Sequence, residues 1–247
     1  DMKNVERTGI VKYDLLGLAT YRQLSLAIKQ IKKRHNVDID LRKIPLDDRN
    51  VFKNIFEKGN TVSVFQFSGA GMQKALKEIK ASTMDDLIAV AALYRPGPMD
   101  YIPDYAKGKF NPSSIKYSHP IIEKHLSNTF GIMVYQEQAM FLSREMANLD
   151  WLEVDKLRKA ISKKSGKQFD ESCANFAKKA YEMNIPQNSV NDVLQLMSKF
   201  GGYAFNKSHS CMYAIVGYWT AYLKHYYPAE WMSACIEADK DDADKID

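Results

Sequence analysis

The chain has 247 residues, of which 45% are hydrophobic, and this is enough apolar material for a buried core. Its three cysteines, Cys173, Cys211 and Cys235, are far apart and form no C-x-x-C pair, which excludes a disulfide framework and a cysteine-based zinc site. The longest apolar run, residues 211–223, is shorter than the roughly 20 residues that cross a bilayer, and the first residues contain no signal-peptide core. We therefore expect a soluble protein of the cytoplasm that has no membrane partner.

The charge of the chain is unevenly distributed. The net charge is +5, but residues 237–247 carry six acidic and two basic side chains. The other 236 residues therefore carry 33 bases and 24 acids, a net charge of +9. A basic body indicates a polyanionic partner such as nucleic acid, although a basic isoelectric point is also common among ordinary soluble proteins.

The first third of the chain predicts a strand and two helices. Residues 9–20 open with alternating apolar and polar side chains, which predicts a short strand, and residues 21–33 continue as a helix. After a connector, Asp47 or Asp48 can cap a further helix. The inner face of that helix would carry Phe52, Ile55 and Phe56.

Turn-forming residues separate the next elements. Residues 61–67 (TVSVFQF), which are flanked by Gly59 and Gly69, predict another strand. Ser82 with Asp85 resembles a capping box at the start of a helix that Pro96 stops. Residues 94–114 contain many prolines and glycines, which predicts a loop.

The rest of the chain predicts a helical subdomain. Five successive segments have helical periodicity, namely residues 119–127, 137–147, 151–164, 169–183 and 187–200. A last helix, residues 210–227, is apolar on nearly all sides and ends before Pro228, which is typical of a central buried helix. The acidic residues 237–247 are expected to fray. The predicted fold is mainly α with a few short strands (α+β).

A basic run lies within the third of these five segments and just beyond it. Its members are Lys156, Arg158, Lys159, Lys163, Lys164 and Lys167. If one helix continued through the run, Lys159, Lys163 and Lys167 would share a face, where they would repel one another unless an anion sat against them. Phosphate is the natural anion, and a solvated face screened by nearby acidic residues is the alternative.

The segment FNKSHS, residues 205–210, leads into the last predicted helix. Lys207 and His209 would lie where the free N–H groups of a helix start favour an anion. Asn206, Ser208 and Ser210 carry groups that can cap the helix or hydrogen-bond a ligand. The alternative is an ordinary helix start at which one of the serines is the N-cap.

Two weaker signals are Arg95, beside the rigid turn of LYRPGP, and the stretch VYQEQ, residues 134–138. In sequence order, however, six stretches together resemble the replicative family C DNA polymerases, which are the bacterial DNA polymerase III alpha subunits and their phage relatives. These stretches are VKYDLLGL (11–18), VFQFSGAGM (64–72), ALYRPGP (92–98), GIMVYQEQAM (131–140), LRKAISKK (157–164) and GYAFNKSHSCMYA (202–214). The resemblance continues to YPAEWM, residues 227–232, and so covers nearly the whole chain.

The resemblance implies the end of the palm in residues 1–20, the fingers domain in residues 21–236 and an acidic tail in residues 237–247. It implies a DNA-directed DNA polymerase whose fingers bind the incoming dNTP and the template during Mg²⁺-dependent nucleotidyl transfer. Asp14 would be one of three aspartates that hold two Mg²⁺ ions, and Lys12 would contact phosphate beside them. The family's other two aspartates form an upstream D-x-D, which the ten residues before VKYDLLGL lack, so the chain is expected to be inactive alone.

The resemblance also implies the binding residues. The incoming dNTP would be contacted by Asn206, Lys207, Ser208, His209, Arg158 and Lys159. DNA would be contacted by Lys163, Lys164, Lys167 and Arg95. The implied partners are primer–template DNA, dNTP, the rest of the palm, the thumb and the sliding clamp, in the cytoplasm of a bacterium or a phage-infected host.

A competing interpretation is a helical nucleic-acid-binding or protein-interaction module without catalysis. Such a module would not need Lys12 and Asp14, and a metal titration in the presence of nucleotide would separate the two interpretations. Asp38 and Asp40 form another possible carboxylate pair, but they lie in a connector and face no third ligand. We therefore reject them as a metal site.

Overall fold

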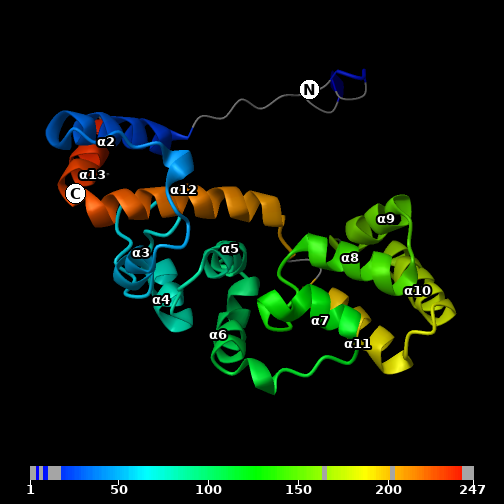
Figure 1. The fold of residues 1–247 in the computed structure, drawn as a ribbon. Coiled ribbons are helices and arrows are strands. Elements are labelled where there is room, and N and C mark those ends of the chain that lie inside the picture. Colours follow the sequence, from blue (N-terminus) through cyan, green and yellow to red (C-terminus); the bar gives the residue numbers. More distant parts are fainter. Residues whose placement is uncertain (1–3, 6–7, 11–17, 163–165, 201–203, 241–247) are drawn as a thin grey trace. The chain divides into compact units, whose positions relative to one another are not determined.

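The computed structural model describes residues 4–5, 8–10, 18–162, 166–200 and 204–240. Within these ranges the chain is helical with connecting turns and has no extended strand (Figure 1). One isolated parallel bridge joins Tyr135 and Phe205. No described helix is both long enough and apolar enough to cross a membrane. The predicted mainly α fold is confirmed.

The chain packs as two compact units. One unit comprises Asp1–Ile39 together with Tyr227–Asp247, and the other comprises Asp40–Tyr226. This division by packing does not follow the predicted boundary at residue 20. The assignment of palm, fingers and tail therefore stays a prediction.

The first unit pairs the helix α2 (Ala19–His35) with α13 (Pro228–Ala238). Glu230 of α13 is buried, and its carboxylate accepts contacts from Arg34 at 3.0 Å and His35 at 2.9 Å. The His35 contact is the main cause that lowers the pKa of Glu230. This buried carboxylate therefore links the end of α2 to the start of α13.

The second unit contains the other helices. The six helices predicted between residues 119 and 227 agree with six consecutive helices of the structure within three residues at each described end. The elements of the unit are η1 (Leu41–Lys43), α3 (Arg49–Val51), η2 (Phe52–Phe56), α4 (Ala70–Ile79), α5 (Met84–Leu93), η3 (Pro98–Tyr101), α6 (Ile102–Phe110), η4 (Pro112–Ser114), α7 (Pro120–Leu126), η5 (Ser127–Thr129), α8 (Gln136–Ala147), α9 (Trp151–Ser162), α10 (Lys167–Glu182), α11 (Gln187–Phe200) and α12 (Lys207–Tyr226).

Helix α12 packs on α5 and α3, and its middle is buried on several sides, as predicted. Tyr218 of α12 is fully buried, and its ring lies 5.3 Å from that of Phe52 and 6.2 Å from that of Phe56. The hydroxyl of Tyr218 accepts a hydrogen bond from the N–H of Asp48, which caps α3 as predicted. Aromatic packing around α12 therefore forms the core of this unit.

The strand predicted for residues 61–67 is wrong. The segment consists of successive turns, and Ser63 and Gln66 have positive φ angles. Its buried residues are Thr61, Val64 and Phe67, which recur every third position rather than every second. A strand would place every second side chain on one face, whereas these turns bury every third side chain.

The loop predicted for residues 94–114 is also wrong in part, because the segment contains η3, α6 and η4. Pro98 is in the first turn of η3, and Pro103 is in the first turn of α6. Proline is tolerated there because the first N–H groups of a helix have no partner within the helix. These prolines therefore begin helices instead of breaking them.

The capping box of α5 lies one residue later than predicted. The hydroxyl of Thr83 accepts a hydrogen bond from the N–H of Asp86 at 3.2 Å. The carboxylate of Asp86 in turn accepts one from the N–H of Thr83 at 3.0 Å. Ser82 and Asp85, the predicted pair, are not the capping residues.

Candidate functional site

The segment FNKSHS forms the entry to α12, which begins at Lys207. The side-chain oxygen of Asn206 accepts a hydrogen bond from the N–H of His209 at 2.8 Å and another from the hydroxyl of Ser208 at 2.6 Å. Asn206 is therefore the N-cap of α12, and neither of the two serines has this role.

A carboxylate from another helix occupies the same helix end. Glu137, in the first turn of α8, accepts hydrogen bonds from the N–H of Lys207 at 3.0 and 3.1 Å and from the side-chain amide of Asn206 at 3.0 Å. The N–H groups of Lys207 and His209, which were expected to be free for an anion, are therefore already bonded. A ligand at this helix end would therefore be bound mainly by side chains and not by these two backbone N–H groups.

The chain on either side of these residues is held by backbone hydrogen bonds. The N–H of Phe205 donates to the carbonyl of Val134 at 3.0 Å, and the N–H of Gln136 donates to the carbonyl of Phe205 at 2.9 Å. The side-chain amide of Gln136 donates to the carbonyl of Ala204 at 3.2 Å. Buried Gln138 accepts from the N–H of Val134 at 2.8 Å and so fixes the turn before α8. The starts of α8 and α12 are thus locked together.

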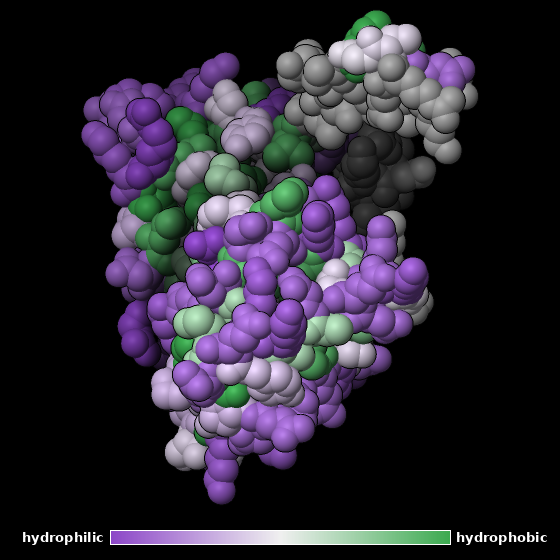
Figure 2. Space-filling model, turned by 90° about the vertical axis from the view of Figure 1, so that its right-hand side faces the viewer, coloured by the Kyte–Doolittle hydropathy of each residue, from purple (hydrophilic) through white to green (hydrophobic). Residues whose placement is uncertain are grey.

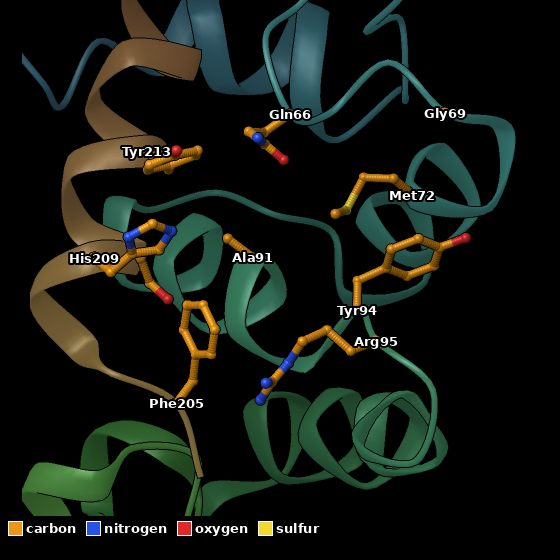
Figure 3. A pocket seen from close by; sticks show the side chains of 10 residues that line it. Gln66, Gly69, Met72, Ala91, Tyr94, Arg95, Phe205, His209 and Tyr213 are labelled. Atoms are coloured by element: carbon orange, nitrogen blue, oxygen red, sulfur yellow. The ribbon is translucent and has the colours of Figure 1, made fainter. Parts of the chain in front are cut away.

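A cavity of about 380 Å³ lies beside the start of α12 (Figure 3). Phe205, His209 and Tyr213 line one side of it, and Tyr94 and Arg95, at the end of α5, line the other. Gln66, from the turns that replace the predicted strand, also lines it. Three segments that are far apart in the sequence therefore meet at one cavity.

Aromatic rings and a cation dominate the cavity wall. The ring of His209 stacks on that of Tyr213 at 4.2 Å and meets the edge of Phe205 at 5.4 Å. The guanidinium of Arg95 lies 4.3 Å from the centre of the Phe205 ring, and burial lowers its pKa. Ser210 is only 1% exposed, and its hydroxyl has no hydrogen-bond partner among the described residues. A wall with stacked rings, a cation and an unsatisfied hydroxyl suits a flat, anionic ligand.

The ammonium of Lys207 does not pair with Glu137. It lies 5.3 Å from the centre of the Tyr135 ring, which is buried. No ion pair joins Lys207 to a carboxylate within the described ranges. Its charge is therefore available to an anion, because cation–π contacts are weaker than ion pairs to phosphate.

Two basic residues of α9 share one carboxylate partner. Arg158 and Lys159 both contact the carboxylate of Asp155 at 2.7 Å, and their hydrogen bonds lower the pKa of Asp155. Neither lines the cavity. Figure 2 shows the side of the molecule where α9 and α10 lie, and its surface is mostly hydrophilic. These contacts agree with the screened, solvated face considered from the sequence, and the DNA contacts expected of Arg158 and Lys159 stay a prediction.

The continuous basic helix face is not formed. Helix α9 ends at Ser162 and α10 begins at Lys167, so Lys159 and Lys167 belong to different helices. Lys167 is 90% exposed and lies 3.7 Å from Glu171. Lys163 and Lys164 lie outside the described residues.

The sequence model of the bacterial DNA polymerase III alpha subunit finger domain matches residues 20–184. The chain belongs to this finger-domain family. It is 41% identical over 250 residues to DNA polymerase III subunit alpha of Xylella fastidiosa strain 9a5c, a match that covers all of this chain and 21% of the relative. It is 40% identical to the proteins of that name from Chlamydia pneumoniae and Aquifex aeolicus, with 99% and 98% of this chain covered and 20% and 21% of those relatives. The chain therefore spans about a fifth of the length of these relatives.

The predicted metal centre of this finger-domain chain is not described by the structure. Lys12 and Asp14 lie outside the described residues, and no three His, Cys, Asp or Glu side chains in the described ranges are grouped to hold a metal. Asp38 contacts Lys32, and Asp40 binds Arg42 and caps η1.

The structure brings together only some of the predicted binding residues of the finger domain. Asn206, Lys207, Ser208 and His209 lie together at the start of α12. Of these four, only His209 lines the cavity, which Arg95 also lines. Sequence reasoning missed the aromatic partners of the cavity and the role of Glu137. Phe205 and Tyr213 were a usable signal, since each is four residues from His209, the spacing of neighbours on one helix face. The contact of Glu137 with a residue 70 positions away left no local signal.

Proposed function

We propose that this chain is the finger segment of a DNA-directed DNA polymerase that acts in DNA replication. The start of α12 and the cavity beside it bind the incoming dNTP. The observation that carries the proposal is the cavity of about 380 Å³, which joins stacked aromatic rings to Arg95 and adjoins the helix turn that carries Lys207.

The chemistry of the cavity fits a nucleotide. Its volume lies within the range of about 300–1,000 Å³ typical of small-molecule sites. The rings of Phe205, His209 and Tyr213 offer flat faces to a base or sugar. Arg95 and Lys207 supply positive charge for a triphosphate, and the hydroxyl of Ser210 lacks a partner that a ligand would provide.

Nucleotidyl transfer in this proposal depends on residues outside the described ranges. Asp14, together with aspartates of the remaining palm, would hold two Mg²⁺ ions, and Lys12 would contact phosphate beside them. When bound, such ions activate the attacking hydroxyl and stabilise the leaving pyrophosphate. The described residues contribute binding and orientation of the nucleotide.

Contacts to DNA are assigned to the basic residues between positions 158 and 167. Arg158 and Lys159 do not line the cavity, so we assign them to the template backbone rather than to the nucleotide. The other members of this set are Lys163, Lys164 and Lys167. Asp155 pairs with Arg158 and Lys159, and Glu171 lies near Lys167, so a phosphate contact by any of these three has to replace an existing ion pair.

The remaining partners of the proposed polymerase are the rest of the palm, the thumb and the sliding clamp. The relatives named above are subunits of DNA polymerase III, and this likeness is the basis for these partners. The same likeness to bacterial proteins supports a site of action in the cytoplasm.

The nucleotide assignment is tested with Lys207→Ala in the full-length protein that carries this segment. We expect kcat/KM for the incoming dNTP to fall by about 10- to 150-fold, because a hydrogen bond to a charged group contributes about 1.5–3 kcal/mol. Lys124→Ala is the matched control, since Lys124 is exposed and paired with Glu145 away from the cavity. Equal kcat/KM values for Lys207→Ala and the wild type would remove the nucleotide assignment.

The DNA assignment is tested by the salt dependence of primer–template binding. Each phosphate that is neutralised contributes a slope of about −0.9 in log affinity against log salt concentration. Arg158→Ala should reduce the magnitude of this slope by about one unit. DNA binding that persists without any effect of Lys207→Ala on nucleotide use would instead favour the non-catalytic nucleic-acid-binding module.

A further inference from the structure

Glu137 is linked by hydrogen bonds, directly or through Asn206, to all four residues from Asn206 to His209, which we call the nucleotide turn. Its carboxylate bonds directly to the N–H of Lys207 and to the side-chain amide of Asn206. Through Asn206 it also reaches the hydroxyl of Ser208 and the N–H of His209. One carboxylate on α8 thus orients four consecutive residues at the start of α12.

The contact with Asn206 fixes which way its amide group points. The Nδ2 atom of Asn206 can only donate, so it faces the acceptor Glu137, and the Oδ1 atom then faces His209 and Ser208. Without an acceptor at Glu137, the amide loses the contact that distinguishes its two ends. The cap of α12 and the position of the His209 ring in the cavity wall therefore depend on Glu137.

The geometry of Glu137 also leaves the charge of Lys207 free to act. The carboxylate binds the backbone N–H of Lys207, whereas the ammonium group lies over the ring of Tyr135. A carboxylate that paired with the ammonium would compete with phosphate for it. Glu137 therefore holds the backbone of Lys207 but does not pair with its ammonium group.

We infer that Glu137 is a positioning residue for the incoming nucleotide. It holds the Asn206–His209 turn in the conformation in which His209 lines the cavity and the Lys207 ammonium is available to phosphate. This inference rests on the proposed function, and it assigns to Glu137 an effect on nucleotide use that acts through Asn206 and Lys207.

The test compares Glu137→Ala, Glu137→Gln and a control in the full-length protein, by single-nucleotide insertion on a primer–template. Glu137→Ala should lower kcat/KM for the dNTP by about 10-fold, because small displacements of binding groups reduce rates strongly. Glu137→Gln keeps one acceptor oxygen and should lower it by about threefold. The control is Glu145→Gln on the same helix. It weakens only the contacts with Lys124 and His125 and should leave kcat/KM for the dNTP unchanged.

Two further readouts separate positioning from general damage. The Kd for primer–template should stay at the wild-type value in both Glu137 variants, which a misfolded protein would not achieve. The double variant Glu137→Ala with Asn206→Ala should lose less than the product of the two single losses, because Glu137 acts through Asn206.

The outcomes are distinguishable. A wild-type kcat/KM for Glu137→Ala alongside a reduced value for Lys207→Ala overturns the inference and leaves the proposed function standing. A kcat/KM that rises in Glu137→Ala also overturns it, since the carboxylate would then compete with phosphate. Wild-type values for both Glu137→Ala and Lys207→Ala overturn both proposals. If Glu137→Ala does not fold, Glu137→Gln decides: a threefold loss at an unchanged Tm supports the inference and a wild-type value overturns it.

Discussion

Replacing Asp86 should destabilise the helix that carries part of the cavity wall. Asp86 of α5 is 2% exposed, and its carboxylate accepts hydrogen bonds from the N–H groups of Ser82 and Thr83 at 2.9 and 3.0 Å. It also accepts one from the hydroxyl of Tyr105 at 3.2 Å and contacts the ammonium of Lys109 at 2.7 Å. Burial and the charge of Asp86 raise the pKa of Tyr105 above its ordinary value, so its hydroxyl stays a donor.

The magnitude follows from what Asp86→Ala leaves behind. The side chain of Lys109 is 15% exposed and would lose its carboxylate partner. Removing one partner of a buried ion pair costs about 3–5 kcal/mol. For a chain of this size each kcal/mol lowers the Tm by about 2–4 °C, so the Tm should fall by roughly 6–20 °C.

The assay is thermal unfolding of wild type, Asp86→Ala and Asp85→Ala. Asp85 is exposed in the same helix turn and contributes only a charge near the helix start, which amounts to about 0.3–1 kcal/mol. Lys109→Met in the Asp86→Ala background should recover part of the loss, because it removes the unpaired charge. A Tm for Asp86→Ala equal to that of Asp85→Ala would refute this reasoning.

Two further predictions concern stability. Hydrogen bonding, first of all from Lys179, lowers the pKa of Glu153 from 4.5 to about 2, so its stabilising contribution is complete above pH 4.5 and is lost as the pH falls toward 2. Glu153→Gln should therefore flatten the acid side of a plot of Tm against pH, and an unchanged acid side would contradict the assignment. A Cβ added to Gly217 of α12 would lie 2.5 Å from Phe67, so Gly217→Ala should reduce the free energy of unfolding by about 1–3 kcal/mol in denaturant titrations. Gly69→Ala is the control, because its Cβ would meet nothing within 4 Å, and equal losses in the two variants would contradict the packing argument.

The helices were predictable where local signals agree with packing. Asp48 caps α3 by its own side chain, and apolar periodicity over α7 to α12 matches the buried faces. The segment 61–67 was not predictable because its apolar pattern fits a strand, whereas its contacts with Gly217 and Thr220 of α12 select turns. Packing between distant segments decided the local conformation in that case.

The candidate site was predictable only in its sequence-local part. The turn from Asn206 to His209 is contiguous, so its position at a helix start could be inferred from the sequence. Arg95 contacts Phe205, which is 110 residues away in the sequence. Glu137 contacts Lys207, which is 70 residues away. No sequence periodicity predicts contacts between residues so far apart. The family resemblance indicated the nucleotide turn but not these contacts.

The central claim, that the start of α12 and its cavity bind the incoming nucleotide, is tested most directly by photo-crosslinking. A dNTP with a photoreactive base is bound to the full-length protein on a primer–template, irradiated, and mapped by mass spectrometry after trypsin digestion. The account predicts crosslinks in the peptides 200–207 and 208–224, which contain Phe205, His209 and Tyr213. Crosslinks confined to peptide 117–124, beside the second cavity of about 300 Å³ between α7 and α11, would contradict it.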